Sequence, residues 1–190
     1  MKYISEYRDS GAVLALAARI RKVAENVPSA TLMEVCGTHT MAIHRFGIRS
    51  LLPANVKMIS GPGCPVCVTP NSFLDRAIAL SRLPQVTIGT FGDLLRVPAS
   101  SSSLAKERAN GGDIRIVYSP LDALRFAIEH PDRRVVFLGV GFETTAPTIA
   151  ATLLEASVRK VENFLVLPAG RVMPPAMIAL LSSEGIRLDG

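Results

Sequence analysis

The run Gly61-Pro62-Gly63-Cys64-Pro65-Val66-Cys67 contains two of the three cysteines of this 190-residue chain. Its glycines allow unusual backbone angles and its prolines fix others, so both thiols are expected on a stiff turn. A C-x-x-C spacing permits a disulfide within the motif, and in a reducing compartment it indicates redox or metal chemistry rather than a structural cross-link. We therefore predict a redox-active pair at Cys64 and Cys67, with a glycine turn that carries incidental thiols as the alternative.

The third cysteine, Cys36, follows an apolar segment and precedes Gly37-Thr38-His39-Thr40. If a helix begins after Cys36, the helix dipole favours the thiolate form of this sulfur. Cys36 and His39 are three residues apart, close enough to bind one iron or zinc ion, but two ligands make an incomplete site that a second protein or a cofactor would have to complete. The alternative is a buried cysteine beside a histidine that caps a turn.

A third motif, Gly141-Phe142-Glu143-Thr144-Thr145, follows an apolar run. Glu143 is a candidate proton donor or acceptor, and the hydroxyls of Thr144 and Thr145 beside helix-terminal amides suit a small anion. Ordinary N-capping of a helix by threonine explains the same residues equally well. The preceding G-x-G lacks a third glycine, which argues against a dinucleotide site.

The elements that must position these motifs alternate between strands and helices. Short runs rich in β-branched and aliphatic residues are each followed by a helical pattern, which predicts an α/β protein with mostly parallel sheets flanked by helices. Ligands bind such sheets at the carboxyl ends of the strands, so we expect the three motifs to line one cleft there. The predicted strands are residues 31–36, 56–60, 85–90, 113–118, 133–140 and 163–167.

The chain is expected to form an N-terminal helix and two small lobes. Residues 11–26 have helical spacing of apolar side chains, and the pattern stops before Pro28. A stretch rich in serine within 97–112 favours a break between lobes, with a single sheet and one Ser-rich loop as the alternative. We predict a helical segment at 1–28, a lobe with the cysteine motifs at 29–98, and a second lobe with the Glu143 motif at 99–190.

Charge and hydropathy argue against several classes of function. The net charge of +5 comes from scattered Lys and Arg residues, and aromatic residues make up only 5% of the chain, so nucleic-acid binding is not expected. No run approaches the roughly 20 apolar residues that span a bilayer. Charged residues near the N-terminus do not fit a secretion signal, and Walker, G-x-S-x-G and H-E-x-x-H motifs are absent. We expect a cytoplasmic protein without a membrane or nucleic-acid partner.

The motifs MEVCGTHT, GPGCPVC, YSPLDAL and GFETT follow one another across nearly the whole chain, and in this order they resemble the HypD family of hydrogenase maturation factors. The resemblance implies a cytoplasmic scaffold, rather than a conventional turnover enzyme, on which the Fe(CN)2CO unit of [NiFe]-hydrogenase is assembled. It also implies two partners, a HypC-type small chaperone and a HypE-type cyanide donor. The motifs are MEVCGTHT at 33–40, GPGCPVC at 61–67, YSPLDAL at 118–124 and GFETT at 141–145.

The resemblance also implies a role for each candidate residue. Cys36 would bind the iron together with a cysteine of the small chaperone, with His39 beside it. Cys64 and Cys67 would relay electrons by thiol–disulfide exchange from a [4Fe-4S] cluster. Three further residues would line the same cleft: Glu143, Thr144 and Thr145.

The chain departs from the family pattern in its length. HypD proteins are about twice as long, and a later cysteine cluster holds their [4Fe-4S] centre, whereas this chain has no cysteine after Cys67. We expect no such cluster here, and the residues after 185 look like the approach to a further strand, as in a fragment of something longer. A stand-alone thiol–disulfide oxidoreductase and a zinc-binding protein are the alternative functions.

Overall fold

The computed structural model describes residues 8–190, which form two compact units. One unit contains the chain up to Cys64 together with Pro174–Gly190, and the other is Pro65–Met173. Of the predicted N-terminal segment 1–28, residues 1–7 lie outside the described residues. No helix formed by residues 8–190 is long and apolar enough to cross a bilayer.

The first unit contains two parallel strands, β1 (Ala30–Glu34) and β2 (Val56–Ser60), whose register pairs Glu34 with Ser60. Asp9 caps the N-terminus of helix α1 (Ser10–Ala24) by accepting the amide of Ala12 at 3.0 Å. The remaining helices are α2 (Gly37–Arg45), α3 (Ile48–Leu51) and α8 (Met173–Leu181), which begins at the last residue of the other unit.

The last two residues of the chain lie along the outer edge of β1. The amide of Asp189 donates to the carbonyl of Thr31 at 2.9 Å, and the amide of Met33 donates to the carbonyl of Gly190 at 2.8 Å. The carboxylate of Asp189 also accepts the amide of Thr31 at 2.8 Å. The segment predicted to approach a further strand therefore bonds with β1 through its backbone.

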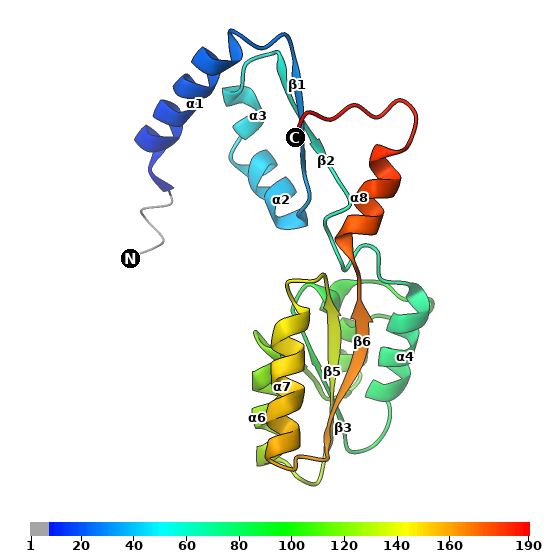
Figure 1. Ribbon diagram of the computed structural model, residues 1–190. Helices are drawn as coiled ribbons and strands as arrows, with labels where there is room; N and C mark the ends of the chain where they lie inside the picture. Colours follow the sequence, from blue (N-terminus) through cyan, green and yellow to red (C-terminus); the bar gives the residue numbers. More distant parts are fainter. Residues whose placement is uncertain (1–7) are drawn as a thin grey trace. The chain divides into compact units, whose positions relative to one another are not determined.

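The second unit is a four-stranded sheet in the order β4-β3-β5-β6, with every neighbouring pair parallel. Figure 1 shows helices α6 and α7 on one face of the sheet and α4 on the other. The strands are β3 (Val86–Thr90), β4 (Ile114–Ile116), β5 (Arg134–Gly141) and β6 (Phe164–Gly170), and the helices are α4 (Asn71–Ser81), the short 3-10 helix η2 (Leu94–Arg96), α5 (Leu104–Ala109), α6 (Pro120–Glu129) and α7 (Ala146–Val158).

Strand β5 supplies side chains to the cores on both faces of this sheet. Val136 and Leu138 belong to the cluster beside α4, whereas Val135 and Phe137 belong to the cluster beside α6 and α7. Successive side chains of a strand point to opposite faces, so a strand covered on both sides must be apolar throughout. This double burial explains why β5 was recognisable as an apolar run.

The predicted α/β class and parallel strands are confirmed, and the observed strands begin and end close to the predicted residues. The compact units are divided differently from the lobes predicted at 29–98 and 99–190. Strand β3 pairs with β4 and with β5, so residues 86–90 share a sheet with the later part of the chain. The Ser-rich stretch lies within the second unit as a loop and a helix cap, because Ser103 caps α5 through the amide of Lys106.

An ion pair between the buried carboxylate of Glu107 and the exposed guanidinium of Arg82 joins α5 to the end of α4. The carboxylate of Glu107, whose side chain is 8% exposed, accepts Nε and Nη2 of Arg82, each at 2.8 Å, and the hydroxyl of Ser102 at 2.5 Å. The hydrogen bonds from Arg82, followed by that from Ser102, lower the pKa of Glu107 from 4.5 to about 2. The pair therefore stabilises the fold only while Glu107 is ionised.

We predict that Glu107→Gln lowers the free energy of unfolding at pH 7 by about 1–2 kcal/mol, because the exposed Arg82 is screened by solvent. A carboxylate with a lowered folded pKa contributes fully above its unfolded pKa of 4.5, and the contribution is lost as pH falls toward about 2. Urea unfolding at pH 7, 4 and 3 measures this, and the difference from the unchanged protein should shrink as the pH falls. Glu129→Gln, at an exposed position in α6, is the matched control. A pH-independent difference would contradict the ion-pair explanation.

Candidate functional site

Cys36 lies where β1 gives way to α2, as the sequence predicted. It is the N-cap residue of α2 with extended backbone angles (φ −154°, ψ 120°), and no side chain caps this helix end. Cys36 is half-buried, and its carbonyl accepts the amide of Thr40 at 3.0 Å. A thiolate on Cys36 would therefore lie beside the uncapped amides of the first turn, which favour a negative charge. His39 is in the same first turn and is exposed.

The loop that carries Cys64 packs directly against the loop that carries Cys36. A Cβ atom on Gly63 would lie 1.7 Å from both the carbonyl carbon and the oxygen of Val35, and 2.3 Å from the nitrogen of Cys36. A Cβ atom on Gly37 would lie 3.6 Å from Cβ and 3.8 Å from the sulfur of Cys64. The peptide before Cys36 and the peptide before Cys64 are thus in backbone contact, which only glycine at position 63 allows.

Glu34 connects the segments on which these two loops are built. Its carboxylate accepts the amide of Cys36 at 3.0 Å and the hydroxyl of Thr40, while its carbonyl accepts the amide of Gly61 at 2.8 Å. The pKa of Glu34 is lowered most by the hydrogen bond from Thr40 and next by that from Ser60. The amide of Cys36 and the charge of His39 lower it further. Glu34 is therefore a carboxylate at neutral pH.

Sequence reasoning passed over Glu34, although a signal was present. It is the last residue of a strand that ends beside a candidate ligand, and a threonine follows six residues later on the next helix. A charged residue at the end of an otherwise apolar strand needs partners when it is partly buried. Ser60 was recognisable as one of them only once the register paired it with Glu34.

Cys67 lies at the start of the second unit, in the turn that leads to α4. It is exposed, and the turn is closed by the hydroxyl of Thr69, which donates to the carbonyl of Pro65 at 2.8 Å, and by the amide of Thr69, which donates to Val66 at 3.2 Å. Helix α4 begins at Asn71, and no side chain caps it. The division between the two units falls between Cys64 and Pro65.

The Glu143 motif follows β5 at its carboxyl end, in the second unit. The carboxylate of Glu143 accepts the amide of Met173, the first residue of α8, at 2.7 Å. Thr145 occupies the N-cap position of α7 without accepting a hydrogen bond, so the N-capping alternative does not explain its side chain. Its side chain lies instead over Gly141, where an added Cβ would be 2.3 Å from the Thr145 hydroxyl oxygen. Thr144 is exposed.

The structure thus brings together part of the predicted site. The motifs of Cys36, His39 and Cys64 are gathered at the carboxyl ends of β1 and β2 in one unit. In the other unit, Cys67 follows the unit boundary, and the Glu143 motif follows β5. In both units the motif residues come after the carboxyl ends of strands, where ligand sites are expected in parallel sheets.

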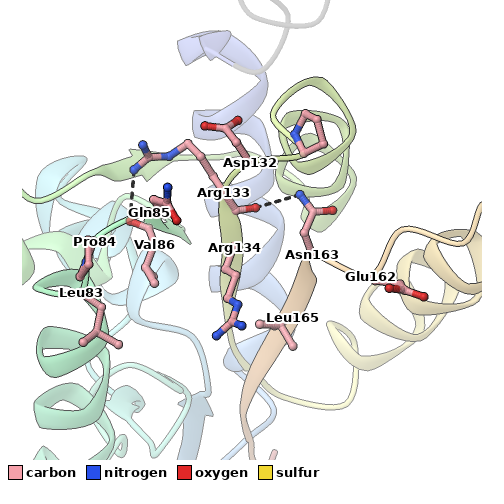
Figure 2. Close-up of a pocket in the computed structure, with 11 residues that line it drawn as sticks. Leu83, Pro84, Gln85, Val86, Asp132, Arg133, Arg134, Glu162, Asn163 and Leu165 are labelled. Carbon is pink, nitrogen blue, oxygen red and sulfur yellow. Dashed lines mark hydrogen bonds between the residues drawn. The ribbon is translucent and has the colours of Figure 1, made fainter.

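A hollow of the second unit lies at the opposite ends of its strands. It has a volume of about 880 Å³, and Figure 2 shows Arg133 and Asn163 on its wall. Asn163 donates to the carbonyls of Ala127, His130 and Arg133 at 2.8, 3.1 and 2.9 Å, so its amide holds the turn before β5. Asn163 therefore serves the fold, and none of the motifs lines this hollow.

Within residues 8–190, no group of three or more His, Cys, Asp or Glu side chains is arranged to hold a metal ion. A structural zinc site uses four protein ligands, so the described residues do not form one. An ion bound at Cys36 would need further ligands from outside these residues.

Comparison with known protein families and with curated proteins indicates the same family in both cases. The family model described as "HypD: Hydrogenase formation hypA family" matches residues 12–190. A hydrogenase maturation factor HypD of Rhizobium leguminosarum bv. viciae is 52% identical over 192 residues, covering 100% of this chain and 50% of the relative.

Two further relatives are also named hydrogenase maturation factor HypD. The HypD of Azotobacter vinelandii is 50% identical over 196 residues, and that of Escherichia coli (strain K12) is 44% identical over 194 residues. Each alignment covers 100% of this chain and 52% of the relative. The chain therefore spans about half the length of these curated relatives.

Proposed function

Because the chain belongs to the HypD family, we propose that it serves hydrogenase maturation as a scaffold that binds iron at Cys36. On this proposal the iron is cargo, and the Fe(CN)2CO unit is assembled on it. We propose a cytoplasmic location, as the resemblance of the motifs implies. The electrons would come from a [4Fe-4S] cluster of the kind expected in the longer family members.

The contact between the Cys36 loop and the Cys64 loop is the observation that carries this proposal. Gly63 lies against the peptide that joins Val35 to Cys36, and the sulfur of Cys64 is beside Gly37. A thiolate at an uncapped helix terminus is a good ligand for iron, and a second thiol within the neighbouring loop can exchange electrons with groups bound there.

Because the ligand set at Cys36 is incomplete, we propose that a partner protein supplies a further ligand. His39 is the nearest further candidate along the chain, and no third ligand joins them within the described residues. Soft thiolates suit iron, so a cysteine of a HypC-type small chaperone would complete the site. A HypE-type partner would then deliver cyanide to the bound iron.

We propose that three residues bind or protonate the ligands that are added to the iron: Glu143, Thr144 and Thr145. Glu143 is exposed and ionisable, and Thr144 presents a hydroxyl near the first turn of α7. A carboxyl group can transfer the protons that cyanide chemistry requires, and a hydroxyl beside helix amides suits a small anion. The hydrogen bond from Met173 gives Glu143 a structural role as well.

We predict that Cys64 and Cys67 form a disulfide under mild oxidation while Cys36 stays reduced. Closing the disulfide releases two electrons and two protons, which matches a two-electron switch. Alkylation followed by mass spectrometry of the intact chain counts the remaining thiols: one after oxidation and three after reduction. Cys64→Ser should leave two thiols under the same oxidant. Three alkylated thiols in the oxidised, unsubstituted chain would contradict the switch.

Infrared spectroscopy of the chain in complex with the small chaperone tests the scaffold proposal. After anaerobic loading with iron, cyanide, CO and a chemical reductant in place of the cluster, cyanide and CO stretching bands are expected on the complex and not on its Cys36→Ala variant. Absence of the bands from the unsubstituted complex would contradict the proposal. Turnover of a model disulfide without any partner would instead support a stand-alone oxidoreductase.

A further inference from the structure

We infer that Glu34 is a positioning residue that holds Cys36 in place by tying its loop to the start of α2 and to the end of β2. This inference rests on the proposed function, because the position of Cys36 matters for function only if Cys36 binds iron. It stands on the hydrogen bonds of Glu34, which exist whether or not iron binds.

The carboxylate of Glu34 receives donors from three separate segments. One is the amide of Cys36 itself, at 3.0 Å, and another is the hydroxyl of Thr40, one turn into α2. The third segment is the end of β2, where Ser60 is the register partner of Glu34 and lowers the pKa of its carboxylate, and where the amide of Gly61 donates to the Glu34 carbonyl at 2.8 Å. A single side chain therefore fixes the cysteine, the helix that follows it and the strand that leads to Cys64.

The donors from Cys36 and Thr40 reach different oxygens of the Glu34 carboxylate, so both oxygens must be acceptors. Its two oxygens offer about four lone-pair sites and no donor, whereas a glutamine has one acceptor oxygen and an NH₂ group that itself donates. In Glu34→Gln at least one of the donors from Cys36, Thr40 and Ser60 would face the NH₂ group and lose its acceptor. A partly buried donor without an acceptor is costly, so the loop should rearrange.

The backbone contact at Gly63 makes the position of Cys36 sensitive to this rearrangement. The nitrogen of Cys36 is one of the atoms that Gly63 lies against, and the same nitrogen donates to Glu34. Releasing this amide lets the half-buried Cys36 shift away from the neighbouring loop. We therefore expect a more accessible and more mobile Cys36 when Glu34 cannot hold it.

The test measures the alkylation rate of Cys36 by iodoacetamide at fixed pH, resolved by mass spectrometry, with Cys67 as the internal reference. In Glu34→Gln the ratio of the Cys36 rate to the Cys67 rate should rise about fivefold, the factor that corresponds to one lost hydrogen bond. Glu25→Gln, an exposed position after α1, should leave the ratio unchanged. An unchanged or lower ratio in Glu34→Gln, or an equal rise for both cysteines, would overturn the inference.

A second pair of variants covers the case in which Glu34→Gln does not fold. Thr40→Val removes one donor to Glu34, whereas Thr38→Val changes an exposed residue of the same helix turn. The Cys36 ratio should rise in Thr40→Val and not in Thr38→Val, and equal ratios in the two would overturn the inference. The assay contains no iron, so failure of the proposed iron binding leaves its result unaffected.

Discussion

Gly63→Ala is expected to force the Cys36 and Cys64 loops apart and to cost about 3 kcal/mol or more of unfolding free energy. The new Cβ would lie 1.7 Å from backbone atoms of Val35 and 2.3 Å from the nitrogen of Cys36. No side-chain rotation relieves a clash with backbone, so one loop must move. Urea unfolding of the purified chain measures the loss, and the Cys36 alkylation rate reports the separation of the loops.

Gly37→Ala is the matched control for this prediction. Its Cβ would meet Cβ of Cys64 at 3.6 Å, an ordinary contact, and alanine is favourable in a helix. We expect its unfolding free energy to stay within about 1 kcal/mol of the original. Equal stabilities for the two alanine variants would show that the loops do not touch through Gly63.

Cys36→Ala is expected to weaken iron binding by about 100-fold or more, because it removes a ligand rather than an outer partner of one. The measurement is an anaerobic Fe²⁺ titration of the chain in complex with the small chaperone. Cys36 is half-buried at a helix cap that lacks a side-chain hydrogen bond, so alanine there should leave the fold intact. The folded state can be checked by far-ultraviolet circular dichroism.

Cys67→Ala serves as the control in the same titration. Cys67 is exposed in the turn before α4, and we propose it as an electron carrier rather than a ligand. Its removal should change the iron affinity by less than about twofold, well below the loss expected from removing a ligand. A larger loss in Cys67→Ala than in Cys36→Ala would reverse the roles assigned to the cysteines.

Strand β5 was predictable because it is buried and apolar. Val135–Val140 of β5 is covered on both faces, so its sequence is an unbroken apolar run that no exposed segment would have. The helix after Cys36 was predictable for a local reason, since Gly37-Thr38 breaks the strand and places the cysteine at the helix cap. Both features depend on short-range sequence.

Features that depend on long-range contacts were not predictable in this way. The division of the chain follows from β3 pairing with both β4 and β5, which no local composition shift marks, whereas the Ser-rich stretch marks only a loop. The role of Glu34 depends on the register that sets it opposite Ser60. The need for glycine at position 63 depends on a contact with Val35, which is 28 residues earlier in the chain.

The central claim is that Cys36 is an iron ligand, and iron K-edge X-ray absorption of the iron-loaded complex with the small chaperone tests it most directly. The account predicts sulfur scattering in the first coordination shell, which decreases in the Cys36→Ala variant and is unchanged in Cys67→Ala. A first shell of oxygen and nitrogen alone, or a sulfur shell that survives unchanged in Cys36→Ala, would contradict the claim.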